Sequence, residues 1–242
     1  MAKLNHIELP NGETVPILYE DRSVLAIDKP RGWMLAPDFW NKTGRNLQTA
    51  LAAGIAAREF WARSRNLRFL RFIHRLDAET TGVVLLAKSK GAVSAYSQLF
   101  ESRQMEKRYL AIVKGVPQRT EWTCRLRLSS EPDNLGRIRV DTTNGKETET
   151  RFRLLKLGAR ASLVEALPVT GRTHQIRVHL AETGHSVIGD QLYGNEKGKG
   201  RLGLRAVSLC YVDPFTKYQV NIQAPAKHFL REFGFAVNDL PE

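Results

Sequence analysis

Basic and apolar residues alternate strictly in one part of the chain, and this pattern restricts the possible folds more than any other in the sequence. Three runs show it: Arg125-Leu126-Arg127-Leu128, Arg137-Ile138-Arg139-Val140 and Arg151-Phe152-Arg153-Leu154. The turn-forming pairs Asp133-Asn134 and Asn144-Gly145 separate these runs. Because successive side chains of a strand point to opposite faces, the segment from Arg125 to Val169 predicts an antiparallel sheet with one buried face and one wet, basic face.

The rest of the sequence adds strands and helices without the alternating rhythm of a parallel sheet. Strands are expected at 17–20, 24–27, 83–87, 107–114, 207–211 and 218–222. Helices are expected at 47–57, from the cap Ser89 onward, and from the cap Thr173 to Thr183, with Gly184 as the stop. A loop is expected at 194–203. We therefore predict an α+β fold with a mainly antiparallel (mixed) β-sheet core and flanking helices.

The length and composition indicate one globular domain. The chain has 242 residues and contains no linker long or polar enough to mark a boundary, so we expect a single catalytic-type domain over 1–242 with 1–16 as an extension. The longest aliphatic run is 83–87, far short of the about 20 residues that span a membrane. The N-terminus has no apolar targeting region, which predicts a cytoplasmic protein. Cys124 and Cys210 are expected to be buried, reduced thiols.

The charge of the chain points to a polyanionic partner. Its 37 Lys and Arg against 25 Asp and Glu give a formal net charge of +12. Nucleic acid is the favoured partner and an anionic membrane surface the lesser one. Six arginines lie between 58 and 75, interleaved with aromatic residues: Arg58, Arg63, Arg65, Arg68, Arg71 and Arg75. Guanidinium groups suit phosphates and aromatic rings suit bases, although a solvated surface over core aromatics is an open alternative.

Two common motifs are excluded by their context. The sequence Gly198 to Gly203 matches the G-x-G-x-x-G pattern, but no strand precedes it and no long helix follows. A spacing of five puts His174 and His179 about 140° apart on a helix, so the two cannot bind one zinc ion as an i, i+4 pair does. We expect a core position for His179 and a polar role for His174 at the helix start. We predict neither a cofactor nor a metal.

The densest group of chemically capable residues is the segment 72–82. It places His74, Asp77, Glu79 and Thr80 between the arginine-rich segment and an apolar strand. Asp77 and Glu79 invite comparison with the carboxylate pair of a glycosidase, although such pairs normally come from separate strands. Stabilisation of a turn is the alternative role for Asp77.

Several segments together resemble one family, the RluA-type pseudouridine synthases. The catalytic motif of that family is similar to His74-Arg75-Leu76-Asp77-x-x-Thr80-x-Gly82, and three further motifs follow the same order along the chain. These are Tyr19-Glu20-Asp21 with Lys29-Pro30-x-Gly32, then Glu106-Lys107-Arg108-Tyr109-Leu110-Ala111 with Gly115, then Gly171 to Leu180 with Gly189-Asp190 and Tyr193-Gly194. The likeness runs from about residue 17 to 229.

The resemblance implies a site and a reaction. Breaking the N1–C1′ bond of uridine and rejoining the base through C5 changes no oxidation state, so no cofactor or metal is demanded. The resemblance gives Asp77 the essential role, either as a nucleophile or as a base toward the ribose, with Arg177 as its charge partner and Tyr109 against the target base. Arg75 fills the gap left by the flipped uridine. The expected RNA-binding residues are Arg75, His74, Thr80, Arg172, His174, Arg65, Arg68 and Arg71.

The chain departs from the family pattern at Thr81, where Ser is usual, and at Arg205, where His is frequent. An S4 RNA-binding domain, present in many relatives, is not expected here. The main hypothesis is an RNA pseudouridine synthase acting on structured rRNA or tRNA, with a monomer as the default state. Two rivals stay open: a non-catalytic RNA-binding or chaperone protein of the same fold, and a carbohydrate-active enzyme that uses Asp77 and Glu79.

Overall fold

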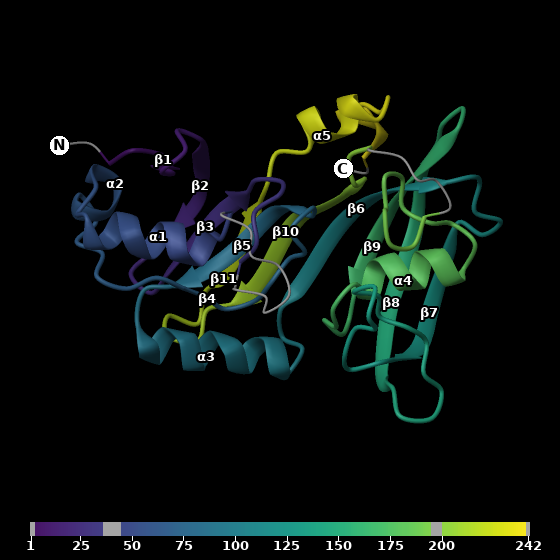
Figure 1. The fold of residues 1–242 in the computed structure, drawn as a ribbon, viewed down its shortest axis with the longest axis horizontal. Coiled ribbons are helices and arrows are strands. Elements are labelled where there is room, and N and C mark those ends of the chain that lie inside the picture. Colours follow the sequence, from purple (N-terminus) through teal and green to yellow (C-terminus); the bar gives the residue numbers. More distant parts are fainter. Residues whose placement is uncertain (1–2, 36–44, 195–199, 241–242) are drawn as a thin grey trace. The chain divides into compact units, whose positions relative to one another are not determined.

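The computed structural model describes residues 3–35, 45–194 and 200–240 (Figure 1). The residues group into two compact units. The first unit comprises Met1–Met105 with Ser208–Ala224, and the second comprises Glu106–Val207 with Pro225–Glu242. Each unit combines helices with antiparallel strand pairs, which confirms the α+β prediction.

The sheet of the first unit is built from short antiparallel strands. In spatial order these are β1 (His6–Glu8), β2 (Thr14–Glu20), β3 (Val24–Lys29) and β5 (Thr81–Ala87), and β4 (Arg71–Phe72) also pairs with β5. The chain returns to this unit in the last part of β10 (Leu204–Val212), which pairs with β11 (Gln219–Gln223). The predicted hairpins are confirmed. The first 16 residues do not simply precede the fold, because β1 pairs with β2.

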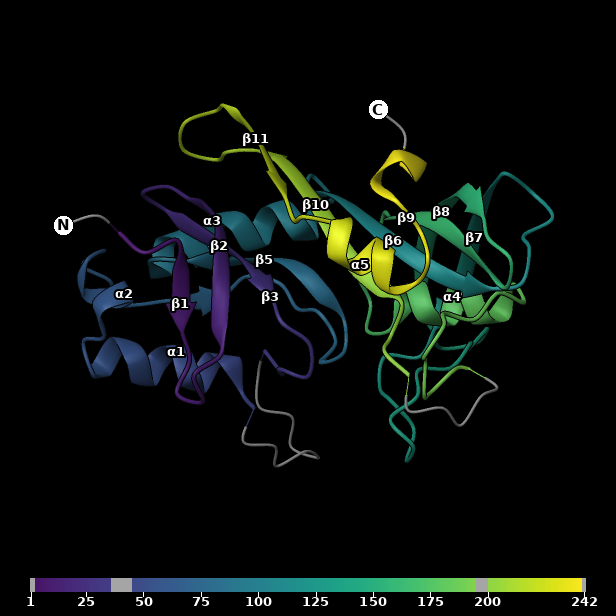
Figure 2. The ribbon, with the colours of Figure 1, turned by 90° about the horizontal axis from the view of Figure 1, so that it is seen from above.

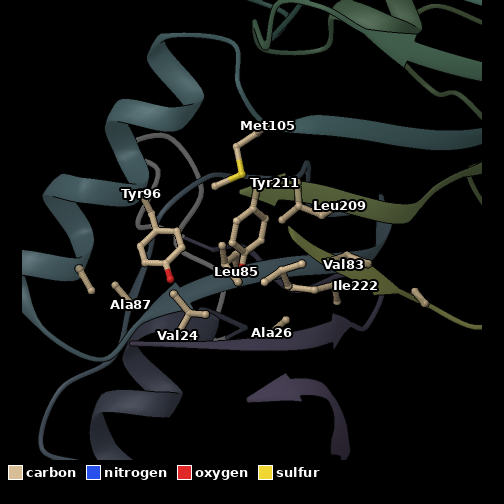
Figure 3. Packing of buried hydrophobic residues seen from close by; sticks show 13 residues of the cluster. Val24, Ala26, Val83, Leu85, Ala87, Tyr96, Met105, Leu209, Tyr211 and Ile222 are labelled. Carbon is tan, nitrogen blue, oxygen red and sulfur yellow. The ribbon is translucent and has the colours of Figure 1, made fainter. Parts of the chain in front are cut away.

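The helices in the described part of the first unit are α1 (Leu47–Ala56), α2 (Phe60–Arg63) and α3 (Lys90–Glu101). Ser89 caps α3 as predicted, since its hydroxyl accepts the amide of Ala92 at 3.1 Å. On the buried face of α3, Tyr96 packs against Tyr211 and the aliphatic side chains of β3 and β5 (Figure 3). The Tyr96 hydroxyl donates to Asp213, which satisfies its polar end inside this core.

In the described part of the second unit, antiparallel strands follow one another in the order β6 (Glu106–Lys114), β9 (Ala161–Pro168), β8 (Lys146–Leu157) and β7 (Glu121–Leu128). One face of β7, β8 and β9 packs against α4 (Gln175–Glu182) (Figure 1). The chain of this unit ends with α5 (Lys227–Glu232) and a 3₁₀ turn at Val237–Asp239, both visible in Figure 2. Phe229 and Leu230 of α5 are buried in a core with Leu110 and Ile112 of β6.

The alternating segment forms two of its three predicted strands. Residues 137–140 are not a strand, and Val140 makes only an isolated bridge to Leu128. The cause is Asp133, whose carboxylate accepts the amides of Leu135 at 2.8 Å and Arg137 at 2.9 Å and so folds the segment into a turn.

The exposed face of this sheet is not basic as a whole, which corrects the prediction from the alternation. The register places Arg125 opposite Glu149, and their side chains form an ion pair of 2.9 Å. Arg153 faces Glu165 of the neighbouring strand in the same way, at 3.0 Å. Cross-strand pairs therefore neutralise many of the arginines on this face.

Helix α4 begins one residue later than predicted. Its N-cap is His174 rather than Thr173, and the backbone of His174 is left-handed with φ of 54°. The stop is confirmed, because Gly184 follows the C-cap with φ of 84°. His179 is confirmed as a core residue: it is fully buried, and its Nε2 lies 2.7 Å from the hydroxyl of Thr148.

Three smaller predictions have different outcomes. Cys124 is buried, but Cys210 is partly exposed, so only one thiol is buried as expected. The predicted loop at 194–203 and the G-x-G-x-x-G match at 198–203 lie in part outside the described residues. In the described part of the chain, no helix is both long and apolar enough to cross a membrane.

Candidate active site

The Asp77 loop, residues 75–80, connects β4 to β5 in the first unit and is held mainly by one buried lysine. The amide of Thr80 donates to the Asp77 carbonyl at 3.1 Å, which closes the turn. Lys29, at the end of β3, donates from Nζ to three carbonyl oxygens: Pro30 at 3.0 Å, Ala78 at 2.7 Å and Thr80 at 3.0 Å. Backbone carbonyls of the loop that carries Asp77 are therefore hydrogen-bonded to Lys29, at the end of β3.

The electrostatics of Lys29 follow from this position. The side chain is fully buried. Burial lowers the pKa of Lys29 to about 7, while the nearby carboxylates of Asp77 and Glu79 oppose this shift. The loop thus combines an acid with an amine whose charge changes near neutral pH.

Glu79 has a different setting from Asp77. Its carboxylate accepts from Nε of Arg31 at 2.6 Å, and its side chain is 48% exposed. This outward ion pair does not support the comparison with a glycosidase, in which the second carboxylate faces the reacting bond from the opposite side.

Two residues expected to bind RNA are turned to the interior of the first unit, one through its contacts and one through its burial. The Nε2 atom of His74 accepts the amide of Leu85 at 3.1 Å, and its ring stacks on Phe100 with centroids 4.7 Å apart. Thr80 is 2% exposed, and its hydroxyl has no hydrogen-bond partner in the described part of the chain. Arg75, by contrast, is exposed beside Asp77 in sequence.

The arginine-rich segment divides into buried and exposed members. The Arg65 side chain is only 3% exposed and donates to Glu20 at 2.8 Å, to the Trp61 carbonyl at 3.1 Å and to the Leu4 carbonyl at 2.5 Å. Arg68 and Arg71 are exposed. Only the exposed arginines offer their guanidinium groups to a ligand at the surface.

The second unit contains Arg177, which is paired inside its own unit. Its Nε and Nη2 atoms donate to the two carboxylate oxygens of Asp190 at 2.7 and 2.8 Å, and both residues are buried. Burial alone would raise the pKa of Asp190, but Arg177 and the amides of Tyr193 and Leu192 outweigh it and lower that pKa. The pair is thus a charged, fork-like contact that fixes the plane of the Arg177 guanidinium.

The start of α4 is organised by Gln175 and His174. The Gln175 side chain accepts from the hydroxyl of Thr170 at 2.7 Å and from the amide of Arg172 at 3.0 Å. The Nδ1 atom of His174 lies 2.9 Å from the hydroxyl of Tyr193. The Arg172 residue itself is exposed, so the loop before α4 presents a cation on a firmly held backbone.

Tyr109 lies on β6 of the second unit, half-buried against the core beneath the sheet. Lys107, two positions earlier and therefore on the same face, donates to the Thr170 carbonyl at 3.4 Å. Burial lowers the pKa of Lys107 to about 8. Tyr109 thus shares its face of β6 with a lysine whose charge is weakened.

Lys29, Asp190 and Tyr193 lie in the sequence motifs, but the sequence alone predicts no role for them. Their burial and their hydrogen-bond partners depend on the tertiary structure. The signal in the sequence that could have identified them is their place in the motifs. The charge of Arg205, where the family often has His, has a partner in the fold: the residue is buried, and its Nε donates to the Pro225 carbonyl at 3.1 Å. Among the described residues, no three His, Cys, Asp or Glu side chains converge as metal ligands would.

Known proteins similar to this chain agree on one family. Residues 23–182 match the model of the family described as RNA pseudouridylate synthase. Ribosomal large subunit pseudouridine synthase C of Vibrio cholerae is 34% identical over 227 residues, which cover 89% of this chain and 67% of that protein. The Escherichia coli protein of the same name is 34% identical over 231 residues, with the same coverage of both chains.

The fold comparison agrees. The structure of human RNA pseudouridylate synthase domain containing 1 matches with a TM-score of 0.67 and 27% identity, covering 87% of this chain and 83% of the human one. The family match spans more than half of the sequence, and it includes the segment that carries Asp77, Tyr109 and Arg177. The chain therefore belongs to the RNA pseudouridine synthases, in the RluA-type family that its motifs indicate.

Proposed function

We propose that this enzyme converts specific uridines of structured ribosomal RNA to pseudouridine, with Asp77 as its essential group. The names of the bacterial relatives favour RNA of the large ribosomal subunit over tRNA. The observation that carries the assignment of Asp77 is its loop, whose backbone accepts two hydrogen bonds from the buried Lys29, at Ala78 and at Thr80. A catalytic group has to be held in place by its surroundings, and this loop is held in that way.

The reaction breaks the N1–C1′ bond, forms a C5–C1′ bond, releases the C5 proton and returns a proton to N1. Asp77 either attacks the sugar covalently or removes a proton from the ribose. Tyr109 stacks on the target uracil, and Arg177 supplies positive charge, its guanidinium oriented by Asp190. These roles are supported by the family motifs and by the firm settings of Asp77 and Arg177.

RNA binding in this proposal involves the exposed cations first. Arg75 fills the gap left by the flipped nucleotide. Arg68, Arg71 and Arg172 contact phosphates, and His174 orients the loop before α4. His74, Thr80 and Arg65 support the RNA surface from within, because their side chains have internal contacts or are buried.

The test of Asp77 is the release of tritium from C5 of uridine. The probe is a transcript of large-subunit ribosomal RNA that carries [5-³H]uridine. Asp77→Asn should reduce release by at least about a hundredfold. Glu79→Gln is the matched control and should leave the rate near that of the wild type. Undiminished release by Asp77→Asn would overturn the assignment, and equal losses from both variants would favour a carboxylate pair.

We also propose that the enzyme works in the cytoplasm as a monomer. Light scattering on the purified protein, measured across a hundredfold range of concentration, should give the mass of one chain, 27.4 kDa. Cell fractionation followed by immunodetection should place it with the ribosomal RNA of the soluble fraction. A dimer mass that does not change with concentration would contradict the proposed monomer.

A further inference from the structure

A polar pocket in the first unit has no role in the chemistry described above. Its volume is about 880 Å³, and it lies where the turn between β2 and β3, the segment 65–68 and Lys88 meet. Ligand pockets in proteins typically have volumes of about 300–1,000 Å³, so this one has the size of a nucleotide site rather than of a single ion.

The pocket and the Asp77 loop lie at opposite ends of the same strands. The ladder of β3 and β5 pairs Val24 with Ala87 at the pocket end and Lys29 with Gly82 at the end that holds the loop. Five residue steps of about 3.3 Å separate the two ends by about 17 Å. The pocket is therefore a different site from the one that carries Asp77, in the same rigid sheet.

Cations dominate the wall of the pocket. Five basic side chains line it: Lys3, Arg22, Arg65, Arg68 and Lys88. The two acidic residues in the wall, Glu20 and Asp21, leave a formal excess of three positive charges. Cationic concave surfaces of this kind concentrate anions.

Both carboxylates are occupied by groups of the protein. Glu20 accepts from Lys88 at 2.8 Å and from Arg65 at 2.8 Å, and these contacts lower its pKa although burial alone would raise it. Asp21 accepts the amides of Ser23 and Val24, each at 2.7 Å. The floor of the pocket is thus a preformed network that does not have to rearrange when an anion arrives.

The rim provides cations of another kind. Arg22 and Arg68 are exposed and make no hydrogen bond or ion pair with any described residue. Arg71 follows at the same end of the sheet, opposite Ala87. Because guanidinium forks bind phosphate through two parallel hydrogen bonds, Arg22 and Arg68 are suited to hold one phosphate group over the pocket.

We propose that this pocket binds a backbone phosphate of the RNA substrate, with its adjoining nucleotide, at a position several nucleotides from the uridine that reacts. The inference rests on the proposed function, since it assigns a second contact to the same RNA. Leu67 is the one aliphatic residue among those that line the pocket, whereas a membrane-binding surface needs several apolar side chains to insert. The enzyme thus recognises RNA through two separated points on one sheet.

The test is the double variant Arg22→Ala, Arg68→Ala, compared with Arg119→Ala, Arg160→Ala. Both pairs consist of exposed arginines without partners among the described residues, and both remove two charges. The probe is the labelled large-subunit transcript. The pocket variant should bind it about tenfold more weakly at 0.1 M salt, with a salt slope lowered by about one or two contacts, and the control should stay near wild type. In tritium release the loss should appear as a raised KM, whereas Arg119→Ala, Arg160→Ala should keep the wild-type KM.

Further arms separate the possible failures. Binding is also measured in the Asp77→Asn background, so the pocket is judged even if the wild-type enzyme releases no tritium and the proposed function fails. Equal weakening by the pocket and control variants would overturn the proposal, because it would show a general charge effect. Competition with the RNA by AMP at micromolar concentrations would also overturn the proposal. So would a pocket variant that loses binding to phosphatidylglycerol vesicles but still binds RNA as the wild type does. Arg22→Lys, Arg68→Lys should keep the salt slope and regain only part of the affinity.

Discussion

Lys29 is the residue whose replacement tests the Asp77 loop most directly. Lys29→Met keeps the length of the side chain and removes its three hydrogen bonds. The Ala78 oxygen keeps the amide of Gly32 as a partner at 2.8 Å, whereas the Pro30 and Thr80 oxygens lose the amine. A buried carbonyl that loses its partner costs about 1–3 kcal/mol; because the Pro30 contact is only part-buried, the cost for the two groups lies in the lower half of about 2–6 kcal/mol.

The variant also removes a buried charge, and this effect depends on pH. The pKa of Lys29 falls from 10.5 to about 7 through burial, which corresponds to about 5 kcal/mol of stability lost below pH 7. Between pH 7 and 10.5 the unfolded chain binds about one more proton at this site than the folded chain, so the wild type gains about 1.4 kcal/mol per pH unit there. The destabilisation by Lys29→Met should therefore be small at pH 6 and should grow to several kcal/mol at pH 9.5.

The measurement is urea unfolding at pH 6, 7, 8 and 9.5, followed by circular dichroism. Lys146→Met, at an exposed position, is the control and should show no such dependence. Tritium release at pH 8 should fall together with stability, because the freed carbonyls no longer hold the loop of Asp77. A difference in unfolding free energy between wild type and Lys29→Met that is constant from pH 6 to 9.5 would refute the reasoning.

Three further predictions concern buried groups. Asp190→Asn should lower the free energy of unfolding by about 3–5 kcal/mol in urea titrations, because Arg177 loses its charged partner in a buried site, and it should also reduce tritium release. Burial lowers the pKa of His179 to about 4. The free energy of unfolding should therefore fall by about 1 kcal/mol per pH unit as the pH drops from 6.5 to 4. In acid titrations, His179→Gln should flatten this dependence. Thr80→Val should leave the melting temperature unchanged or raise it, because it removes an unpartnered buried hydroxyl; a loss of more than about 1 kcal/mol would reveal a partner for that hydroxyl.

Local patterns in the sequence predicted most of the elements, and their exceptions have a common cause. Alternation located β7 and β8, and the cap Ser89 located the start of α3. The strand expected at 137–140 does not form, because the carboxylate of Asp133 accepts backbone amides that would otherwise donate to a neighbouring strand. The prediction of a basic face was wrong in part. The register that places arginines opposite glutamates joins segments distant in sequence, and local alternation does not show that register.

The candidate site shows the same division. The family could be identified from motifs whose order and residue types are readable along the chain, and with it came the reaction and the candidates Asp77, Tyr109 and Arg177. The motifs could not show that Lys29 holds the Asp77 loop, that Asp190 orients Arg177, or that the Arg65 side chain is buried while Arg68 is exposed. Burial and the choice of partner arise from contacts between segments tens of residues apart, and those contacts set the desolvation that changes a pKa or leaves a charge available to RNA.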